Sequence, residues 1–144
     1  MRHWKKRTWV LFFVIDLLVV IQFIPVNRNN PEVTGEINAP EEVMAILRRS
    51  CYDCHSNETV WPWYSYVAPA SWLISHDVHD GREELNFSEW TTYTEKRKRH
   101  KRKECYEEIA EGEMPLWFYV PLHPDAELMQ EDIQTLVSWG KENN

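Results

Sequence analysis

The sequence predicts an all-α fold, in which one small helical domain is preceded by one N-terminal transmembrane helix. The chain has 144 residues, and about 115 to 120 of them follow an apolar N-terminal run, which suits one compact domain. Apolar residues recur at helical spacing in several later segments, and no segment shows the convincing alternation of a strand. We therefore expect an N-terminal anchor over 1–25, a linker over 26–39 and one domain over 40–144.

The N-terminal segment has the pattern of a membrane-targeting sequence. Four cations lie within the first seven residues, and an apolar run over 8–24 follows them, interrupted by Asp16. An acidic residue at the centre of a membrane helix costs roughly 2.5 to 3.5 kcal/mol, which the surrounding apolar side chains can offset. The basic flank predicts that the chain beyond Pro25 is exported. Because no small-residue cleavage site follows, we expect an uncleaved, single-pass anchor in a bacterial inner membrane, with the domain facing the periplasm.

The segment over 26–39 is predicted to be a tether between the anchor and the domain. It contains Pro31 and Gly35 and has no hydrophobic period, which is typical of a linker.

Several helical segments are predicted in the domain. The first begins near Pro40 and leads directly into a pair of cysteines, with Val43, Ile46 and Leu47 on one face. An aromatic stretch over 61–66 is interrupted by proline and does not suit a long helix. Glycine is predicted to end two of the later helices, because it readily takes the left-handed conformation found at helix C-termini. These later segments are a helix over 70–80 ended by Gly81, a short helix from Ser88 or Glu89, a charged helix over 95–111 ended by Gly112, and an amphipathic closing helix over 130–140.

Charge argues against one class of partner. The chain holds 23 acidic and 16 basic residues, and this balance disfavours binding to nucleic acid. The exception is the run over 96–103, where seven Lys or Arg residues surround His100. Such a run also matches a nuclear-localisation or nucleic-acid patch. In an exported chain with acidic residues next to it, the run is better interpreted as a solvated helix face.

The chemistry is predicted by five consecutive residues, Cys51-Tyr52-Asp53-Cys54-His55, which form a C-x-x-C-H motif. This is the pattern of covalent haem attachment. Two thiols at this spacing can add to the two vinyl groups on one edge of a porphyrin, and the adjacent imidazole then lies below the iron. We therefore predict haem c as the cofactor, attached through Cys51 and Cys54. His55 is the predicted proximal iron ligand, with its other ring nitrogen in a positioning hydrogen bond.

The cysteine pair has three other interpretations. A structural zinc site needs four ligands, and no second pair of the required spacing accompanies the first. A thioredoxin-like redox site needs a βαβ context, which this sequence lacks. A structural disulfide between Cys51 and Cys54 stays open, because an exported protein can form one.

Met114 is the favoured candidate for the sixth iron ligand. It lies just after the expected helix end at Gly112 and is followed by Pro115, so its loop is stiffened; a thioether opposite histidine raises the haem potential. A methionine that only fills the core is the alternative. His123 is the rival distal ligand, and an open iron position is a further possibility. The pair His76 and His79 offers too few ligands for a metal site.

Arg82 and Cys105 are two further residues with a predicted role or environment. Arg82 is predicted to pair with a haem propionate, because a guanidinium matches a carboxylate well. Cys105 is the third cysteine, placed in the charged helix and expected to be half-buried. A disulfide from it to Cys51 or Cys54 would compete with haem attachment.

Short motifs rich in tryptophan accompany the cysteine pair. They are Trp61-Pro62-Trp63-Tyr64, Ala68-Pro69, Ser71-Trp72, Asp77-Val78, Gly81-Arg82, Leu85-Asn86-Phe87-Ser88-Glu89-Trp90, Gly112-x-Met114-Pro115 and His123-Pro124. Together with Cys51-x-x-Cys54-His55-Ser56 they resemble the bacterial haem-binding domain family of small exported proteins, from Pro40 to Trp139. The resemblance implies a cytochrome c-like helical fold around one haem, with the family's Met-Pro matched by Met114. One departure is Met129, where relatives tend to have a Ser or Thr cap, which costs about 1 kcal/mol of helix stability.

The expected function is electron transfer by a mono-haem c-type cytochrome, an electron carrier more than an enzyme. Redox proteins of the periplasm or membrane are the expected partners, with basic patches that match the acidic domain; the basic run over 96–103 would be a separate docking face. A haem-based ligand sensor or a peroxidase-like protein is the alternative if Met114 is not on the iron. A thiol-disulfide module built on the three cysteines is the third possibility.

Overall fold

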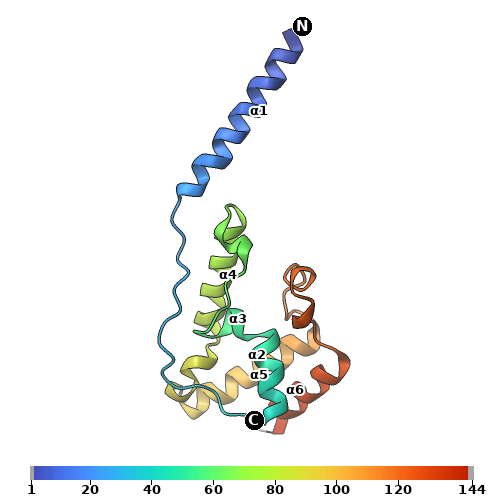
Figure 1. Ribbon diagram of the computed structural model, residues 1–144. Coiled ribbons are helices and arrows are strands. Elements are labelled where there is room, and N and C mark those ends of the chain that lie inside the picture. Colours follow the sequence, from blue (N-terminus) through green and yellow to red (C-terminus); the bar gives the residue numbers. More distant parts are fainter. Residues whose placement is uncertain (1, 143–144) are drawn as a thin grey trace. The chain divides into compact units, whose positions relative to one another are not determined.

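The computed structural model describes residues 2–142, and residues 1, 143 and 144 at the ends of the predicted anchor and domain lie outside this range. All regular structure in the described range is helical, with no strand (Figure 1), as the sequence predicts. The α-helices are α1 (Arg2–Val20), α2 (Glu41–Ser50), α3 (Tyr52–His55), α4 (Ala70–Glu84), α5 (Glu95–Glu111) and α6 (Gln130–Glu142). The 3₁₀-helices are η1 (Ile21–Phe23), η2 (Trp63–Tyr66), η3 (Phe87–Thr92), η4 (Val120–Leu122) and η5 (Pro124–Ala126).

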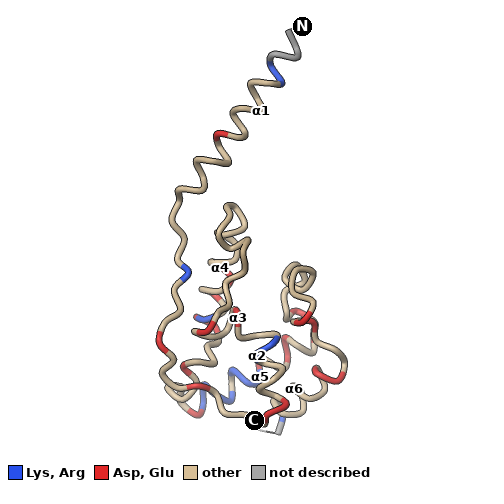
Figure 2. The backbone as a smooth tube through the Cα atoms, in the orientation of Figure 1, with Lys and Arg blue, Asp and Glu red and all other residues tan. Residues whose placement is uncertain are grey.

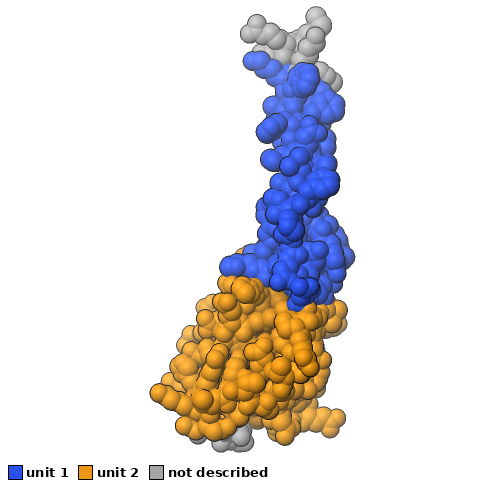
Figure 3. All heavy atoms as spheres, turned by 90° about the vertical axis from the view of Figure 1, so that its left-hand side faces the viewer, with its two compact units in different colours: residues 1–29, 61–77 blue, residues 30–60, 78–144 orange. Residues whose placement is uncertain are grey.

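The chain forms two compact units, coloured in Figure 3. The first takes the described residues up to Asn29 together with Trp61–Asp77, and the second takes Asn30–Val60 together with the chain from Val78 onward. The second unit holds the cysteine pair, His55, Arg82 and Met114, and therefore most of the predicted site.

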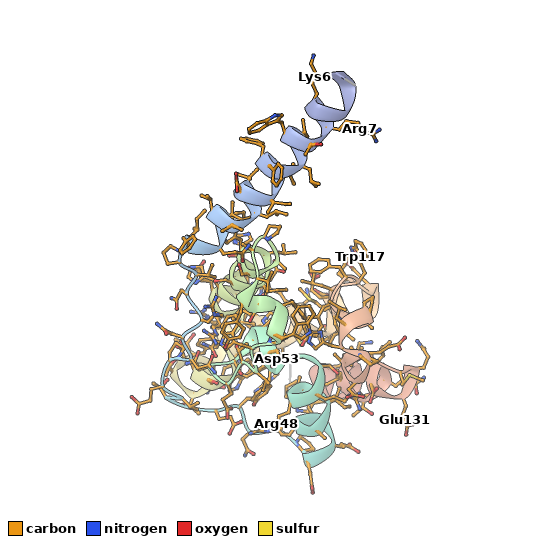
Figure 4. The ribbon with its side chains drawn as sticks, turned by 45° about the horizontal axis from the view of Figure 1, so that its top comes forward. Lys6, Arg7, Arg48, Asp53, Trp117 and Glu131 are labelled. Carbon is orange, nitrogen blue, oxygen red and sulfur yellow. The ribbon has the colours of Figure 1, made fainter. Side chains whose placement is uncertain are left out.

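The predicted transmembrane helix is not supported. Among the described residues, no helix is both long enough and apolar enough to cross a membrane. The physical reason is visible in α1, which begins with basic residues, contains Asp16 and ends at Val20, so that the last residues of the apolar run fall outside it. Figure 4 labels Lys6 and Arg7 in the early turns of this helix.

The segment predicted to be a linker is hydrogen-bonded within the units. In the first unit, the Arg28 guanidinium donates to the carbonyl of Ser65 at 3.1 Å. From Asn30 on the chain is part of the second unit, where the amides of Thr34 and Ile37 donate to the carbonyls of Ser88 and Phe87 at 3.1 and 2.9 Å. Ile37 itself is only 3 % exposed and contributes to the core.

The core of the second unit is built from α2, α5, α6 and η3. The predicted apolar face of α2 is confirmed, because Val43, Ile46 and Leu47 are all buried. Helices α5 and α6 pack against each other. The Tyr106 side chain of α5 lies so close to the backbone at Gly140 that an added Cβ would be 2.6 Å from Cδ1 of Tyr106.

Glycine ends one of the two helices for which this was predicted. Gly112 has a φ of 79° and accepts the left-handed conformation at the C-terminus of α5, which runs over the predicted residues. At Gly81 the prediction is wrong, because α4 continues through it to Glu84. The short helix expected from Ser88 or Glu89 is the 3₁₀-helix η3, which begins at Phe87. At the start of α6 the amide of Met129 donates to the Asp132 carboxylate at 2.9 Å, so the missing Ser or Thr cap is replaced in part from inside the helix.

Three lysines of the basic run on α5 pair with acidic side chains, and Figure 2 colours both kinds of residue along the backbone. Lys98 pairs with Glu95 at 2.8 Å, and Lys101 pairs with Glu104 at 2.8 Å and with Glu84 at 3.2 Å. The Arg102 guanidinium lies over the Trp90 and Trp139 rings instead. This arrangement agrees with a solvated helix face and leaves less charge for the separate docking face that the sequence suggested.

Candidate functional site

The C-x-x-C-H motif lies where α2 passes into the single turn α3. The Cys51 amide donates to the carbonyl of Leu47 at 2.9 Å and closes α2, while the His55 amide donates to the carbonyl of Cys51 at 2.9 Å and closes α3. Residues three and four apart on one turn share a face, so this turn brings Cys51, Cys54 and His55 to the same side. Both cysteines of the motif are half-buried thiols outside any disulfide.

The His55 ring is oriented by backbone carbonyls. Its Nδ1 atom lies 2.8 Å from the carbonyl oxygen of Gly81 and 3.0 Å from that of Leu85. A carbonyl oxygen only accepts, so Nδ1 carries the proton and Nε2 keeps the lone pair. Burial lowers the pKa of His55, which favours the neutral ring. A neutral imidazole with a fixed tautomer is the form that ligates a metal.

Gly81 allows α4 to approach the motif closely enough for this contact. A Cβ added at Gly81 would lie 2.8 Å from the Cys54 carbonyl oxygen, closer than real Cβ contacts. The glycine therefore acts here through its missing side chain and not as a helix end. A glycine inside a helix lowers helix stability by about 1 kcal/mol relative to alanine. Its presence within a helical pattern was therefore a sequence signal for a packing role.

The environment of the cysteines does not favour thiolate chemistry. Burial raises the pKa of Cys51 above its usual range and raises the pKa of Cys105 to about 12. Cys105 is half-buried, as predicted, and packs with Cys51 against the core. Reactive dithiol sites lower the pKa of the attacking thiol, so these shifts speak against the thiol-disulfide alternative.

Arg82 fixes the chain that follows the motif. Its Nε donates to the carbonyl of Ser56 at 2.7 Å, and one terminal nitrogen donates to Oδ1 of Asn30 and to Oγ1 of Thr59, both at 2.8 Å. A haem propionate at this guanidinium would have to share it with these three oxygens. Arg82 therefore has a structural role, which is to hold the chain after the motif, and the sequence did not reveal this role. The propionate contact stays a prediction.

Buried polar groups connect the chain just after the motif with η3 and the residues that flank it. The amide of Asn57 donates to Oγ of Ser88 at 2.9 Å, and Nδ2 of Asn86 donates to Oδ1 of Asn57 at 2.9 Å. The hydroxyl of Tyr93 accepts from the Asn86 amide at 3.0 Å. All four residues are buried, and each bond satisfies a group that would otherwise be costly to bury. Asn86 and Ser88 are polar residues that flank Phe87 in the sequence, and this pattern was a sequence signal for their part in the network.

Met114 directly follows the end of α5. The amides of Glu113 and Met114 donate to the carbonyl of Glu108 at 3.0 and 3.4 Å, as expected for a helix closed by a left-handed glycine. Met114 is half-buried. The backbone at Met114 is therefore held at the C-terminus of α5, which ends at the predicted residue.

The loop beyond Met114 is joined to the motif by a hydrogen bond that sequence reasoning missed. The hydroxyl of Tyr119 donates to Oδ2 of Asp53 at 2.7 Å. Figure 4 labels Asp53 on α3 and Trp117 on the segment between α5 and η4. His123, the rival ligand, stacks on the Tyr119 ring with centroids 3.9 Å apart, and its Nδ1 lies 3.2 Å from the Tyr119 carbonyl oxygen.

The remaining candidate histidines, His76 and His79, are exposed on α4. His79 pairs with Glu83 at 3.3 Å on the exposed side of α4, and His76 is exposed in the first unit. Within the described residues, no group of three or more His, Cys, Asp or Glu side chains could hold a metal ion.

Comparison with known proteins assigns the chain to one family. The family described as "Haem-binding domain" matches residues 16–142, which is most of the chain. No curated protein and no solved structure matches this chain.

Proposed function

Because this chain belongs to the haem-binding domain family, we propose that it is a mono-haem c-type cytochrome that carries electrons on the periplasmic side of a bacterial inner membrane. The observation that carries the proposal is the arrangement of His55. Two backbone carbonyls hold Nδ1, so Nε2 keeps a lone pair for a metal, and Cys51 and Cys54 of the same motif are free thiols. Haem would supply a one-electron iron couple at this site.

The two cysteines fit covalent attachment. Each thiol would add across one vinyl group, so that sulfur bonds to one carbon, hydrogen passes to the other, and no oxidant is needed. The turn that holds Cys51 and Cys54 on one side matches two attachment points on one porphyrin edge. His55 would then ligate the iron through Nε2, while Gly81 and Leu85 keep its ring from rotating.

Met114 is the proposed second axial ligand. Three observations support this. Met114 directly follows the end of α5, its side chain is half-buried, and the hydrogen bond from Tyr119 to Asp53 connects its loop with the motif. A thioether opposite histidine raises the haem potential and leaves the iron without an open position. That coordination favours electron transfer over ligand sensing or peroxide chemistry, both of which need such a position.

Location and partners are part of the same proposal. The cations before the apolar run over 8–24 support export, and covalent haem attachment in bacteria takes place outside the cytoplasmic membrane. The exposed apolar side chains along α1, from Trp9 to Val20, suit contact with a membrane. The formal net charge of −7 favours redox partner proteins with basic patches and weak, salt-sensitive encounters.

Spectra of the holoprotein with and without carbon monoxide test the proposal. We expect a haem that is reduced reversibly, shows thioether ligation in the ferric state and does not bind carbon monoxide rapidly when reduced. Met114→Ala should open the iron to carbon monoxide, whereas Met129→Ala, at an exposed methionine, should behave like the parent. Rapid carbon monoxide binding by the parent would contradict electron transfer and favour the sensor or peroxidase alternative.

A further inference from the structure

The bond between Tyr119 and Asp53 joins two parts of the chain that are 66 residues apart in the sequence. One end is the third residue of the C-x-x-C-H motif, and the other is the centre of a segment that we name the Met114 loop, residues 113–123. At 2.7 Å between Oη and Oδ2, the contact has the length of a well-formed O–H···O hydrogen bond.

Asp53 is a rigid acceptor for this bond. Its other carboxylate oxygen, Oδ1, accepts the amide of Val60 at 2.9 Å, and its backbone carbonyl accepts the hydroxyl of Thr59 at 2.7 Å. Thr59 is in turn held by the Arg82 guanidinium at 2.8 Å. The carboxylate that receives Tyr119 is therefore fixed to the motif turn and to the chain that follows it.

The Met114 loop is anchored at both ends and at Tyr119. It starts at the closed end of α5, and beyond it Ala126 is buried where η5 packs against α2. Between these ends the side chains of Trp117 and Leu122 are 83 % and 63 % exposed and add little packing. The stacked ring of His123 stiffens Tyr119, since its Nδ1 also lies close to the Tyr119 carbonyl oxygen.

We propose that Tyr119 is a positioning residue for the iron site, and that its hydrogen bond to Asp53 determines how completely Met114 occupies the sixth iron position. The inference rests on the proposed function, because it requires haem on the motif and Met114 as its ligand. An iron–thioether bond is easily replaced, so its occupancy depends on how far the loop that carries the sulfur can move. A phenol held by the motif itself limits that movement directly.

The test compares holoprotein variants that each lose one tyrosine hydroxyl. Tyr119→Phe removes the bond to Asp53. Tyr52→Phe is the matched control, because the Tyr52 hydroxyl lies on the same motif turn and donates at 2.9 Å to Oε1 of Glu36, a residue outside the Met114 loop. The readouts are the charge-transfer band of thioether-ligated ferric haem, the midpoint potential and the rate of carbon monoxide binding to ferrous haem.

We expect Tyr119→Phe to weaken the thioether band, lower the potential and raise carbon monoxide binding by roughly tenfold or more, the factor that corresponds to losing a hydrogen bond to a charged group. Tyr52→Phe should keep all three readouts of the parent. Identical readouts for Tyr119→Phe and the parent, with the thioether band present in both, would overturn the role of Tyr119 and leave the proposed cytochrome intact.

Failure of the proposed coordination gives a different result. If the parent lacks the thioether band and Met114→Ala changes nothing, then Met114 is not a ligand and the role of Tyr119 falls with it. If Tyr119→Phe does not yield folded holoprotein, Asp53→Asn replaces the charged acceptor by a neutral amide and is measured in the same way. A partial loss of the band supports the proposal, and an unchanged band overturns it.

Discussion

The Nδ1 atom of His55 lies 2.8 Å from the carbonyl oxygen of Gly81, at the point where α4 passes so close to Cys54 that a side chain at Gly81 does not fit. The two facts are connected, because the close approach places that carbonyl within reach of the ring. The carbonyl fixes the tautomer, and the tautomer leaves Nε2 able to bind iron. A missing side chain on one helix therefore prepares the ligand on another.

Gly81→Ala should lower both stability and haem content. In an ordinary helix interior this change stabilises by about 1 kcal/mol, but here the new Cβ meets the Cys54 carbonyl oxygen at 2.8 Å. We expect overpacking to reverse the sign and to destabilise the protein by about 1 to 3 kcal/mol. Thermal unfolding and the haem-to-protein ratio are the measurements, with Glu83→Ala on the same helix as the control. A more stable Gly81→Ala protein with full haem content would contradict the packing role.

Arg82→Lys should destabilise the protein although it keeps the charge. A lysine ammonium cannot reproduce the directed donation from the guanidinium to the oxygens of Ser56, Asn30 and Thr59. We expect a loss of roughly 1 to 3 kcal/mol, measured by denaturant unfolding. The same change at exposed Arg99 should cost little. If Arg82→Lys changes only the redox potential and not the stability, a propionate is the main partner of this side chain.

Cys105 should make the folded protein sensitive to alkali. Burial raises the pKa of this thiol from 9.0 to about 12, so the unfolded chain releases the proton at lower pH than the folded chain. The stability contributed by the protonated thiol is complete below pH 9.0 and is lost as the pH rises towards about 12. Unfolding of the parent and of Cys105→Ala across this range checks the prediction. Equal pH profiles for the two proteins would show that the thiol is not protected in this way.

Much of the fold follows from local patterns in the sequence. Helix α5 runs over its predicted residues to Gly112, because a charged helical segment followed by a glycine specifies its own end. The apolar face of α2 was predictable because Val43, Ile46 and Leu47 recur at helical spacing. The cysteine pair and His55 were found in the sequence because haem attachment requires fixed spacing within five residues, and their role as the attachment site stays a prediction.

The rest depends on contacts between distant residues. Gly81 has the local pattern of a helix end, and its actual role depends on Cys54, 27 residues earlier in the chain. The bond of Tyr119 to Asp53 has no local signal, because neither residue belongs to a pattern that needs the other. The segment over 26–39 was interpreted as a linker because it has no hydrophobic period. In the structure its amides near Ile37 donate to backbone carbonyls about fifty residues later in the chain.

The most direct test of the central claim is the intact mass and haem stain of the denatured protein, made in cells competent for cytochrome c maturation. The variants to compare with the parent are Cys51→Ala/Cys54→Ala and, as a matched control, Cys105→Ala. We predict one haem mass added to the parent and to Cys105→Ala, and none on the double variant. A parent that carries no covalent haem, or a double variant that still carries it, would contradict the assignment of Cys51 and Cys54 as the attachment site.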